Sequence, residues 1–476
     1  MKYEVVIGLE IHVELATKSK IFCGCTTEFG GEVNTHVCPI CTSMPGTLPV
    51  MNEKVVEFAA KAGLALNCEV ANFSKMDRKN YFYPDLPKAY QISQFDLPVC
   101  NGGHVDIEIE GETKRIGITR IHMEEDAGKL IHDQWENGSL VDYNRCGVPL
   151  IEIVSEPDMR SPEEARAYVE KVRSILQYVG VSDCKMQEGS LRADVNLSLR
   201  PVGQKEFGTR TEMKNLNSFK SILRAAESEI KRQTRVLDEG GTVIQETRRW
   251  DDDAAKSYSM RSKEEAHDYR YFPEPDLVPI ELSDDTINEY RKSLPELPHE
   301  RFLRYTDQMG IPEYDAKLIT VSVKTADFFE QVVNAGADAK SASNWIMGDL
   351  MRLMKEVDTE DIPFDGQLLS ELIDLIKKGA ISNNIGKTVF NEMFKTGKTP
   401  KDIVKEKGLE VVSDAGQLEE IADRIIIANP KSVEDYIGGK QKAIGFLMGQ
   451  IMKETKGKAN PGIVNKMLRE KLEALK

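Results

Sequence analysis

The stretch GLEIHVEL, Gly8–Leu15, alternates apolar and ionisable side chains, which is typical of a β-strand with one buried face. Apolar residues at every second position predict that this face packs into a core. The opposite face carries Glu10, His12 and Glu14. It is either exposed to solvent or part of a site, and the pattern of one strand does not decide between the two.

Two further segments, RIHMEEDAGK (Arg120–Lys129) and SLRADVNLSLR (Ser190–Arg200), show the same alternation. Their polar faces carry one histidine and several charged or amide side chains: His122, Glu124, Asp126, Arg192, Asp194 and Asn196. Glu125 falls on the other face of its strand, or is bulged towards the same site. Three strands therefore offer carboxylates on their polar faces.

Carboxylates from three strands would repel one another in one sheet unless a cation lies among them. Mg²⁺ is the natural candidate because it prefers carboxylate and water oxygens and commonly bridges them to phosphates. Imidazole is a less usual ligand of Mg²⁺, so Mn²⁺, or a role for His12 outside the ligand sphere, stays open. The alternative is a solvated sheet face, which each strand taken alone would favour.

Four of the eight cysteines form two close pairs, Cys23 with Cys25 and Cys38 with Cys41. Two pairs on tight turns offer the four soft ligands that a tetrahedral structural Zn²⁺ requires. His36 is an alternative ligand, and four reduced, unligated cysteines are the other interpretation. The remaining cysteines are isolated and are expected to be packing residues: Cys68, Cys100, Cys146 and Cys184.

The segment DRKNYFYPDLPK, Asp77–Lys88, combines cationic and aromatic residues. Lys79 and Lys88, next to rigid Tyr and Pro residues, could hold phosphate or neutralise a developing charge. A plain aromatic turn is the alternative. The segments IGKT and TGKT lack the first glycine of a Walker A motif, so ATP would have to bind by another route.

The chain of 476 residues is expected to be cytoplasmic, because its N-terminus lacks a signal-peptide pattern and no apolar run reaches membrane-spanning length. Its net charge of −15 argues against a protein whose whole surface wraps nucleic acid. Residues 1–294 mix strands with two expected helices, one between the capping Ser161 and Gly180 and one from about Phe219 to Leu237.

A proline-rich segment follows, and the pattern then becomes helical almost throughout. We expect an all-α domain at 295–405 and a tail domain at 406–476. Positions 440–476 hold nine Lys or Arg against three Asp or Glu. This basic end would suit contact with a nucleic-acid backbone, although a solvated helical face is the alternative.

The chain resembles the B subunits of the bacterial Asp/Glu-tRNA(Asn/Gln) amidotransferases, the GatB family, at motifs spread over its length. They are GLEIHVEL, the paired cysteines, RKNYFYPDLPKAYQISQ, GITRIHMEEDAGK, DYNRCGVPLIEIVSEPD, QEGSLRADVN, MKNLNSF, DYRYFPEPDL and GFLMGQIMKETKGKANP. The resemblance implies an α+β fold. Its parts would be an N-terminal antiparallel-sheet cradle similar to glutamine synthetase and guanido kinases, a helical domain, and a YqeY-like tail that binds tRNA.

The resemblance also implies a two-step reaction. ATP phosphorylates the side-chain carboxylate of Glu on mischarged tRNA(Gln), or of Asp on tRNA(Asn), and ammonia then displaces the phosphate. The site residues that it implies are the Mg²⁺ ligands Glu10, His12 and Glu125, the catalytic residues Glu124, Asp194, Lys79 and Lys88, and the cofactor-binding residues Glu152 and Arg192. Lys79, Lys88 and Glu125 would lie at the end of an ammonia channel.

The implied partners are an amidase A subunit, which releases ammonia from glutamine, a small C subunit, and tRNA. No membrane partner is expected. Two other functions stay open. The chain could be a tRNA-binding scaffold with a structural Zn²⁺ and no catalysis, or a free-standing ligase that uses dissolved ammonia on a small carboxylate. Sequence alone does not say which mischarged tRNA is the substrate, or which of Glu124 and Glu125 faces the metal.

Overall fold

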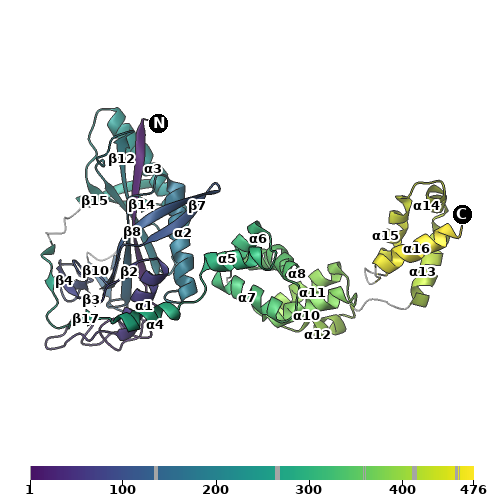
Figure 1. Cartoon of the computed structure of the whole chain (residues 1–476), viewed down its shortest axis with the longest axis horizontal. Helices are drawn as coiled ribbons and strands as arrows, with labels where there is room; N and C mark the ends of the chain where they lie inside the picture. Colours follow the sequence, from purple (N-terminus) through teal and green to yellow (C-terminus); the bar gives the residue numbers. More distant parts are fainter. Residues whose placement is uncertain are drawn as a thin grey trace. The chain divides into compact units, whose positions relative to one another are not determined.

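The computed structural model of the chain (Figure 1) describes residues 2–132, 138–262, 269–357, 359, 361–409, 415–455, 459 and 461–475. The chain divides into two compact units, Met1–Leu297 and Pro298–Lys476. The division lies close to the end of the expected first domain at residue 294. The first unit is a mixed α+β structure and the described part of the second is helical, as the sequence predicted.

A large sheet forms the first unit, with the strand that contains GLEIHVEL near its middle. In sheet order the strands are β15 (Lys256–Ser262), β14 (Glu246–Asp251), β13 (Thr211–Lys214), β12 (Leu191–Pro201), β1 (Tyr3–Glu14), β11 (Pro149–Ser155), β8 (Glu112–Glu125), β6 (Cys100–Asn101) and β2 (Glu69–Val70), and β7 (His104–Ile109) also pairs with β8. Because β1 has an antiparallel neighbour on each side, its polar face can combine side chains from several strands.

The expected antiparallel sheet has one exception among the described strand pairs, because β13 and β14 run parallel. The chain between them forms helix α3 (Phe219–Asp238). Parallel neighbours cannot be joined by a tight turn and need a crossover, which is usually a helix. The predicted helix from Phe219 to about Leu237 is therefore confirmed, and it supplies this crossover.

Helices cover one face of the sheet. They are α1 (Glu53–Ala65), α2 (Pro162–Val179) and α3, and α2 and α3 lie along one side of the sheet in Figure 1. Their apolar residues pack against Leu9, Ile11 and Val13 of β1, each at most 1% exposed. Full burial of such a side chain contributes roughly 1.5–3 kcal/mol. The alternation in GLEIHVEL therefore directs one face into this core and leaves the charged face on the opposite side.

The ends of α2 follow the predicted signals. Ser161 accepts a hydrogen bond from the N–H of Glu164, and Gly180 ends the helix in the left-handed conformation with φ 74°. The Glu164 carboxylate accepts from the N–H of Arg160 at 2.7 Å, one residue before the capping serine.

Smaller sheets complete the first unit. They are a three-stranded sheet of β16 (Phe272–Pro273), β4 (Asp77–Asn80) and β5 (Tyr90–Ser93), the pair β9 (Lys129–His132) and β10 (Ser139–Asp142), and the pair β3 (Phe73–Ser74) and β17 (Ile280–Glu281). Helix α4 (Asp284–Lys292) follows. The pairing of β16 with β4 brings the segment after residue 268 next to Lys79, although almost two hundred residues separate them in sequence.

The described helices of the second unit are α5 (Pro298–Asp307), α6 (Glu313–Val321), α7 (Val323–Asn334), α8 (Ala339–Trp345), a π-helical turn (Ile346–Leu350), α9 (Met351–Glu356), α10 (Gly366–Lys377), α11 (Asn383–Thr396), α12 (Pro400–Glu406), α13 (Ala415–Ala428), α14 (Pro430–Ile437), α15 (Ala443–Glu454) and α16 (Pro461–Glu473). Helices α13 to α16 pack around an apolar core of their own, which includes Leu447 and Leu468. Three of the basic tail residues, Lys456, Lys458 and Lys476, lie outside the described residues.

Among the helices that the structure describes, none combines the length and the apolar composition that a bilayer crossing demands.

Candidate active site

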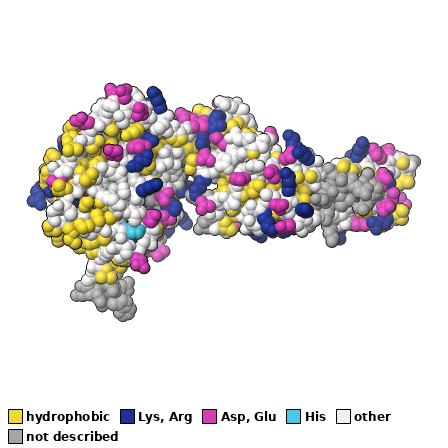
Figure 2. All heavy atoms as spheres, turned by 90° about the horizontal axis from the view of Figure 1, so that it is seen from below, with side chains coloured by type: hydrophobic (Ala, Val, Ile, Leu, Met, Phe, Trp, Pro, Cys, Tyr) yellow, Lys and Arg dark blue, Asp and Glu magenta, His cyan; other side chains and the backbone are white. Residues whose placement is uncertain are grey.

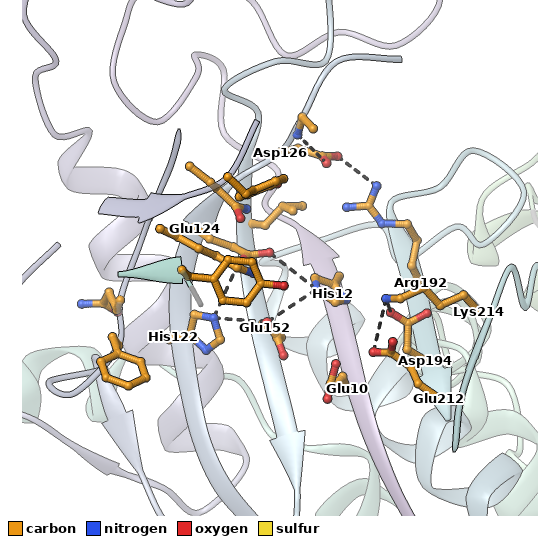
Figure 3. Close-up of a pocket in the computed structure, with 18 of the residues that line it drawn as sticks. Glu10, His12, His122, Glu124, Asp126, Glu152, Arg192, Asp194, Glu212 and Lys214 are labelled. Carbon is orange, nitrogen blue, oxygen red and sulfur yellow. Dashed lines mark hydrogen bonds and ion pairs between the residues drawn. The ribbon is translucent and has the colours of Figure 1, made fainter. Parts of the chain in front are cut away.

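The polar face of the large sheet forms the floor of a cavity of about 550 Å³ (Figure 3). Side chains of β1, β8, β11, β12 and β13 line this floor. Lys79 of β4 and two tyrosines, Tyr269 and Tyr271, line it from outside the sheet. The strands that the sequence predicted to carry charged residues therefore meet at one open, polar cavity, and the alternative of an unrelated solvated face on each strand does not apply.

Two histidines and two glutamates lie together on this floor, and we call His12, His122, Glu124 and Glu152 the histidine cluster. The register pairs His12 of β1 with Glu152 of β11, and Glu152 with His122 of β8. Glu124 is two residues beyond His122 and so faces the same side. Nε2 of His12 lies 3.5 Å from a carboxylate oxygen of each glutamate, and Nε2 of His122 lies 3.2 Å from Glu152.

Charges compensate one another within the histidine cluster. Burial alone would lower the pKa of His12, but the Glu152 and Glu124 carboxylates raise it to about 9. Burial alone would raise the pKa of Glu152, yet the two imidazoles, His122 before His12, hold it well below its ordinary value. Glu124 and Glu152 are therefore ionised and can bind a cation. A metal ion bound by the His12 imidazole would displace its proton.

Glu10, Asp194 and Glu212 form a second group, which we call the acidic cluster. Glu10 of β1 pairs with Asp194 of β12, and the next strand, β13, contributes Glu212. Lys214 Nζ lies 2.6 Å from Asp194 and 3.5 Å from Glu212, and Figure 3 shows it above these two carboxylates. Burial disfavours the Lys214 charge, but Asp194 and Glu212 outweigh this and raise its pKa.

Both clusters have donor sets that fit a divalent cation. In the acidic cluster, and in the histidine cluster at His12, Glu124 and Glu152, one ligand atom from each residue lies within 4.8 Å of the others. The all-oxygen set of the acidic cluster fits Mg²⁺, whereas the imidazole of the histidine cluster also suits Mn²⁺. Because Glu10 and His12 are two residues apart on one strand, their α-carbons lie about 6.7 Å apart.

Glu125 does not join Glu10 and His12, so the expected Mg²⁺ ligand set is wrong on this point. As the immediate neighbour of Glu124 on β8, it points to the opposite face of the sheet. Its Oε2 lies 2.6 Å from Lys88 Nζ, and its Oε1 accepts a hydrogen bond of 2.9 Å from the N–H of Ile92. Glu124 therefore occupies the inward position that the sequence left open between the two.

The two lysines of the aromatic segment are separated in the same way. Lys79 lines the cavity, with its Nζ 4.7 Å from the ring centre of Tyr269. Lys88 is buried with Glu125 outside the cavity, and this carboxylate outweighs the effect of burial and raises the Lys88 pKa. Arg192 also lines the cavity and forms an ion pair of 3.1 Å with Asp126, which Figure 3 shows at one end of the cavity.

The four paired cysteines lie together, away from the cavity. The Sγ atoms of Cys23, Cys25, Cys38 and Cys41 are all within 4.8 Å of one another, and those of Cys38 and Cys41 are 3.9 Å apart. A tetrahedral Zn²⁺ with Zn–S bonds near 2.3 Å separates its sulfurs by about 3.8 Å, so the residues fit this ion. A hydrogen bond from Cys23 lowers the pKa of the Cys41 thiol to about 4, whereas the same hydrogen bond raises the pKa of Cys23 and burial raises that of Cys25.

Comparisons with known proteins cover almost the whole chain. The family model of the GatB/GatE catalytic domain matches residues 5–288, and that of the GatB domain matches residues 327–472. The chain belongs to the GatB family. The resemblance found in the motifs is therefore confirmed.

Relatives of the GatB family agree along their full length. The aspartyl/glutamyl-tRNA(Asn/Gln) amidotransferase B subunits of Caldicellulosiruptor saccharolyticus and Brevibacillus brevis are 63% and 57% identical to this chain, each over 100% of both chains. The protein of that name from Thermoanaerobacter sp. is 63% identical over 99% of this chain and 100% of its own. By these names the GatB family supplies the B subunit of an enzyme, a tRNA-dependent amidotransferase.

Several cavity residues of this GatB chain were missed by sequence reasoning. Glu212 and Lys214 lie on alternate positions of TEMK, but β13 has only four residues, which is too short for a clear period of two. Tyr269 and Tyr271 belong to the motif DYRYFPEPDL, which has no period of two and was given no role in the site. His122 was placed on the polar face but given no role, and its contact with Glu152 depends on the register of two strands.

Proposed function

We propose that this chain activates the side-chain carboxylate of Glu on mischarged tRNA(Gln), or of Asp on tRNA(Asn), by transfer of phosphate from ATP, and that ammonia then displaces the phosphate. The observation that carries this proposal is the pair of clusters, histidine and acidic, side by side on the floor of one cavity. The name shared by the relatives, which makes them B subunits of an Asp/Glu-tRNA(Asn/Gln) amidotransferase, supports the substrate class.

Glu10, Asp194 and Glu212 would hold one Mg²⁺, and His12, Glu124 and Glu152 would hold a second divalent ion. Bound there, the ions would screen the negative charges of the nucleotide and the substrate carboxylate, which otherwise repel each other during phosphoryl transfer.

Cationic side chains of the cavity would complete the charge balance. Lys79 is held over the ring of Tyr269, and Arg192 is held by Asp126, so both cations reach the cavity from fixed positions. A preoriented cation stabilises a developing negative charge without having to reorganise during the reaction. We assign Lys79 and Arg192 to the phosphate or the carboxylate of the substrate.

An apolar pocket of about 250 Å³ next to the cavity would take the nucleoside of ATP. It shares Glu10 with the cavity, and its wall includes Val6, Gly8, Pro157 and Phe207. A nucleobase in this pocket would direct its phosphates towards Glu10 and the acidic cluster. Apolar pockets with a few polar groups at one end are the usual form of small-molecule sites.

Lys88 and Glu125 would serve the ammonia step, at the end of a channel from the amidase. Their ion pair borders a small pocket that also includes Lys20, Cys23 and Cys41, so it lies beside the cysteine cluster. Glu125 and Glu124 are consecutive residues of β8, which places the pair directly behind the histidine cluster.

The four cysteines would hold a structural Zn²⁺, which would fix the loop between β1 and α1. Exposed apolar residues of this loop, Phe29, Met44, Leu48 and Val50, range from 56% to 75% exposed. Hydrophobic side chains also cover a broad area of the face of this unit seen in Figure 2. Such a surface would suit a partner protein. The B-subunit name implies a multi-subunit complex, and we assign the surface to an amidase subunit and a small subunit of that complex.

The basic tail would contact the backbone of the tRNA.

We further propose that the sheet unit shares its architecture with glutamine synthetase and guanido kinases. This similarity is supported by the arrangement of the sheet, one face of which carries all the ligands of both clusters while helices cover the other face.

The test is amide formation by the complete complex with mischarged tRNA, ATP and glutamine. Alanine substitution of Glu10 or His12 is expected to abolish the amide while tRNA binding is retained. Glu4→Gln is the matched control, because Glu4 shares the polar face of β1 but pairs with Arg200 away from the cavity. Normal activity of both alanine variants would instead support a tRNA-binding scaffold. ATP turnover with free glutamate and no tRNA would support a free-standing ligase.

A further inference from the structure

Lys20 is a fully buried lysine beside the cysteine cluster, with 0% of its surface exposed. Its Nζ donates to the carbonyl oxygen of His36 at 2.7 Å and to that of Tyr143 at 3.4 Å, and it lies 3.7 Å from Cys41 Sγ. Among the described residues, no carboxylate comes within ion-pair distance of this ammonium. Glu125, on the wall of the same small pocket, is paired with Lys88.

A buried ammonium is strongly unfavourable unless a negative charge compensates it. The two carbonyl oxygens satisfy its hydrogen bonds but carry no net charge. The group beside Nζ that can carry such a charge is the sulfur of Cys41. Four thiolates around one divalent ion carry two formal negative charges, and Cys41 Sγ places this charge next to Nζ. The metal-bound form of the cluster therefore explains the burial of Lys20.

Lys20 also joins the two halves of the cluster. Its backbone N–H donates to the carbonyl oxygen of Cys25 at 2.9 Å, on the first cysteine pair. Its side chain reaches Cys41 of the second pair. Lys20 therefore contacts both cysteine pairs and places its positive charge beside a cysteine sulfur. Lys18, two residues before it, is exposed and has no such contact among the described residues.

We propose that Lys20 is the counter-cation of the four-cysteine metal site. Its ammonium neutralises part of the thiolate charge, raises the affinity of the site for Zn²⁺, and protects the sulfurs from electrophiles. The inference rests on the Zn²⁺ site proposed above. Groups that touch metal ligands in this way typically change metal affinity by about 10- to 100-fold when they are removed.

The first experiment measures Zn²⁺ affinity of the full-length chain by competition with a chromogenic chelator. Lys20→Met keeps the length and apolar character of the side chain but removes its charge, and Lys18→Met is the matched control. Affinity is expected to fall by about 10- to 100-fold for Lys20→Met and to stay unchanged for Lys18→Met. Equal affinities for the Lys20→Met variant and the wild type would overturn the proposal.

The same variants separate a charge effect from lost packing. In the metal-free, reduced chain the two formal negative charges of the metal-bound cluster are absent, so Lys20→Met is expected to lower the melting temperature less than it does with Zn²⁺ bound. A side chain that acts only through packing would lower the melting temperature equally in both forms, and that result would contradict the proposal.

A second measurement uses only the wild-type chain and so does not depend on the folding of a variant. Lys20 is expected to resist an amine-acylating reagent when Zn²⁺ is bound and to become labelled after chelation, as read by mass spectrometry of its peptide. Unchanged protection after chelation would count against the inference. Replacement of Zn²⁺ by Co²⁺ tests the site itself, because absence of the thiolate-to-cobalt absorption band would refute the four-cysteine site.

Discussion

Glu124 and Glu125 are consecutive residues whose carboxylates serve opposite faces of one sheet. An oxygen of Glu124 lies 3.5 Å from Nε2 of His12, whereas an oxygen of Glu125 lies 2.6 Å from Nζ of Lys88. The strand therefore separates two chemical environments by its own thickness. On one face a carboxylate is available to a metal ion, and on the other a carboxylate neutralises a buried lysine.

Substitution of these two glutamates is expected to affect different steps. Glu124→Gln removes a ligand of the histidine cluster and should lower tRNA-dependent ADP formation by more than about 100-fold, beyond the loss typical of groups outside the ligand set. Glu125→Gln should retain ADP formation and lose glutamine-dependent amide, because it alters the pair with Lys88 and the hydrogen bond from Ile92 but no ligand of the histidine cluster. Parallel assays of ADP and of amidated tRNA measure the two steps, and equal loss of ADP formation in both variants would contradict the separation.

Glu212 should be as important as the acids that the sequence revealed. Glu212→Gln removes one of three charges from the acidic cluster, so the reaction should need a higher Mg²⁺ concentration, by about 10-fold or more. Activity as a function of Mg²⁺ measures this shift. Glu206→Gln, at an exposed position, serves as the control. An identical Mg²⁺ dependence in the Glu212 variant would remove Glu212 from the proposed site.

A larger side chain at Gly8 should narrow the apolar pocket beside Glu10 that we assign to the nucleoside of ATP. A Cβ at Gly8 would lie 3.7 Å from Pro157, an ordinary contact, so the strand should tolerate Gly8→Val while its methyl groups fill the pocket. KM for ATP is expected to rise by about 10-fold and KM for tRNA to stay unchanged. A KM for ATP that does not change would place the nucleoside elsewhere.

The tail should bind tRNA mainly through charge. Lys442 and Lys453 are exposed. Replacing both with alanine should weaken tRNA binding and reduce the slope of log affinity against log salt concentration by about 2, because each phosphate contact contributes roughly one unit to this slope. Filter binding at several salt concentrations measures the slope. Lys378→Ala, an exposed lysine just after α10, is expected to leave it unchanged. An unaltered slope in the double variant would argue for a tail that does not touch the backbone.

Much of the site could be predicted from single strands, and the remainder could not for identifiable reasons. Alternation in β1 and β12 was enough to place Glu10 and Asp194 on one face, because long strands show a clear period of two. The orientation of Glu125 could not be predicted, because it depends on whether β8 has a bulge at its end. No residue there indicates whether a bulge is present. Which carboxylates approach each other depended on the pairing of different strands, and this pairing is set by packing over the whole sheet.

The fold shows the same limit. The helix that begins at Phe219 was predicted from its own residues, and the structure adds Ser218 as its cap. The role of this helix as a crossover between the parallel strands β13 and β14 was not predicted, because the residues of a helix do not indicate which strand the next strand will pair with. Local signals determine where an element begins and ends, and the partners of each element come from the core as a whole.

Because Glu10 and His12, one ligand of each cluster, alternate with the buried residues of β1, a single inserted or deleted residue in the middle of this strand would exchange its two faces beyond that point. Carboxylates would then enter the apolar interior and aliphatic side chains would face the cavity. Such an insertion or deletion would abolish folding and activity together. A folded variant in which a length change has moved Glu10 and His12 off the cavity face of β1 is therefore not expected.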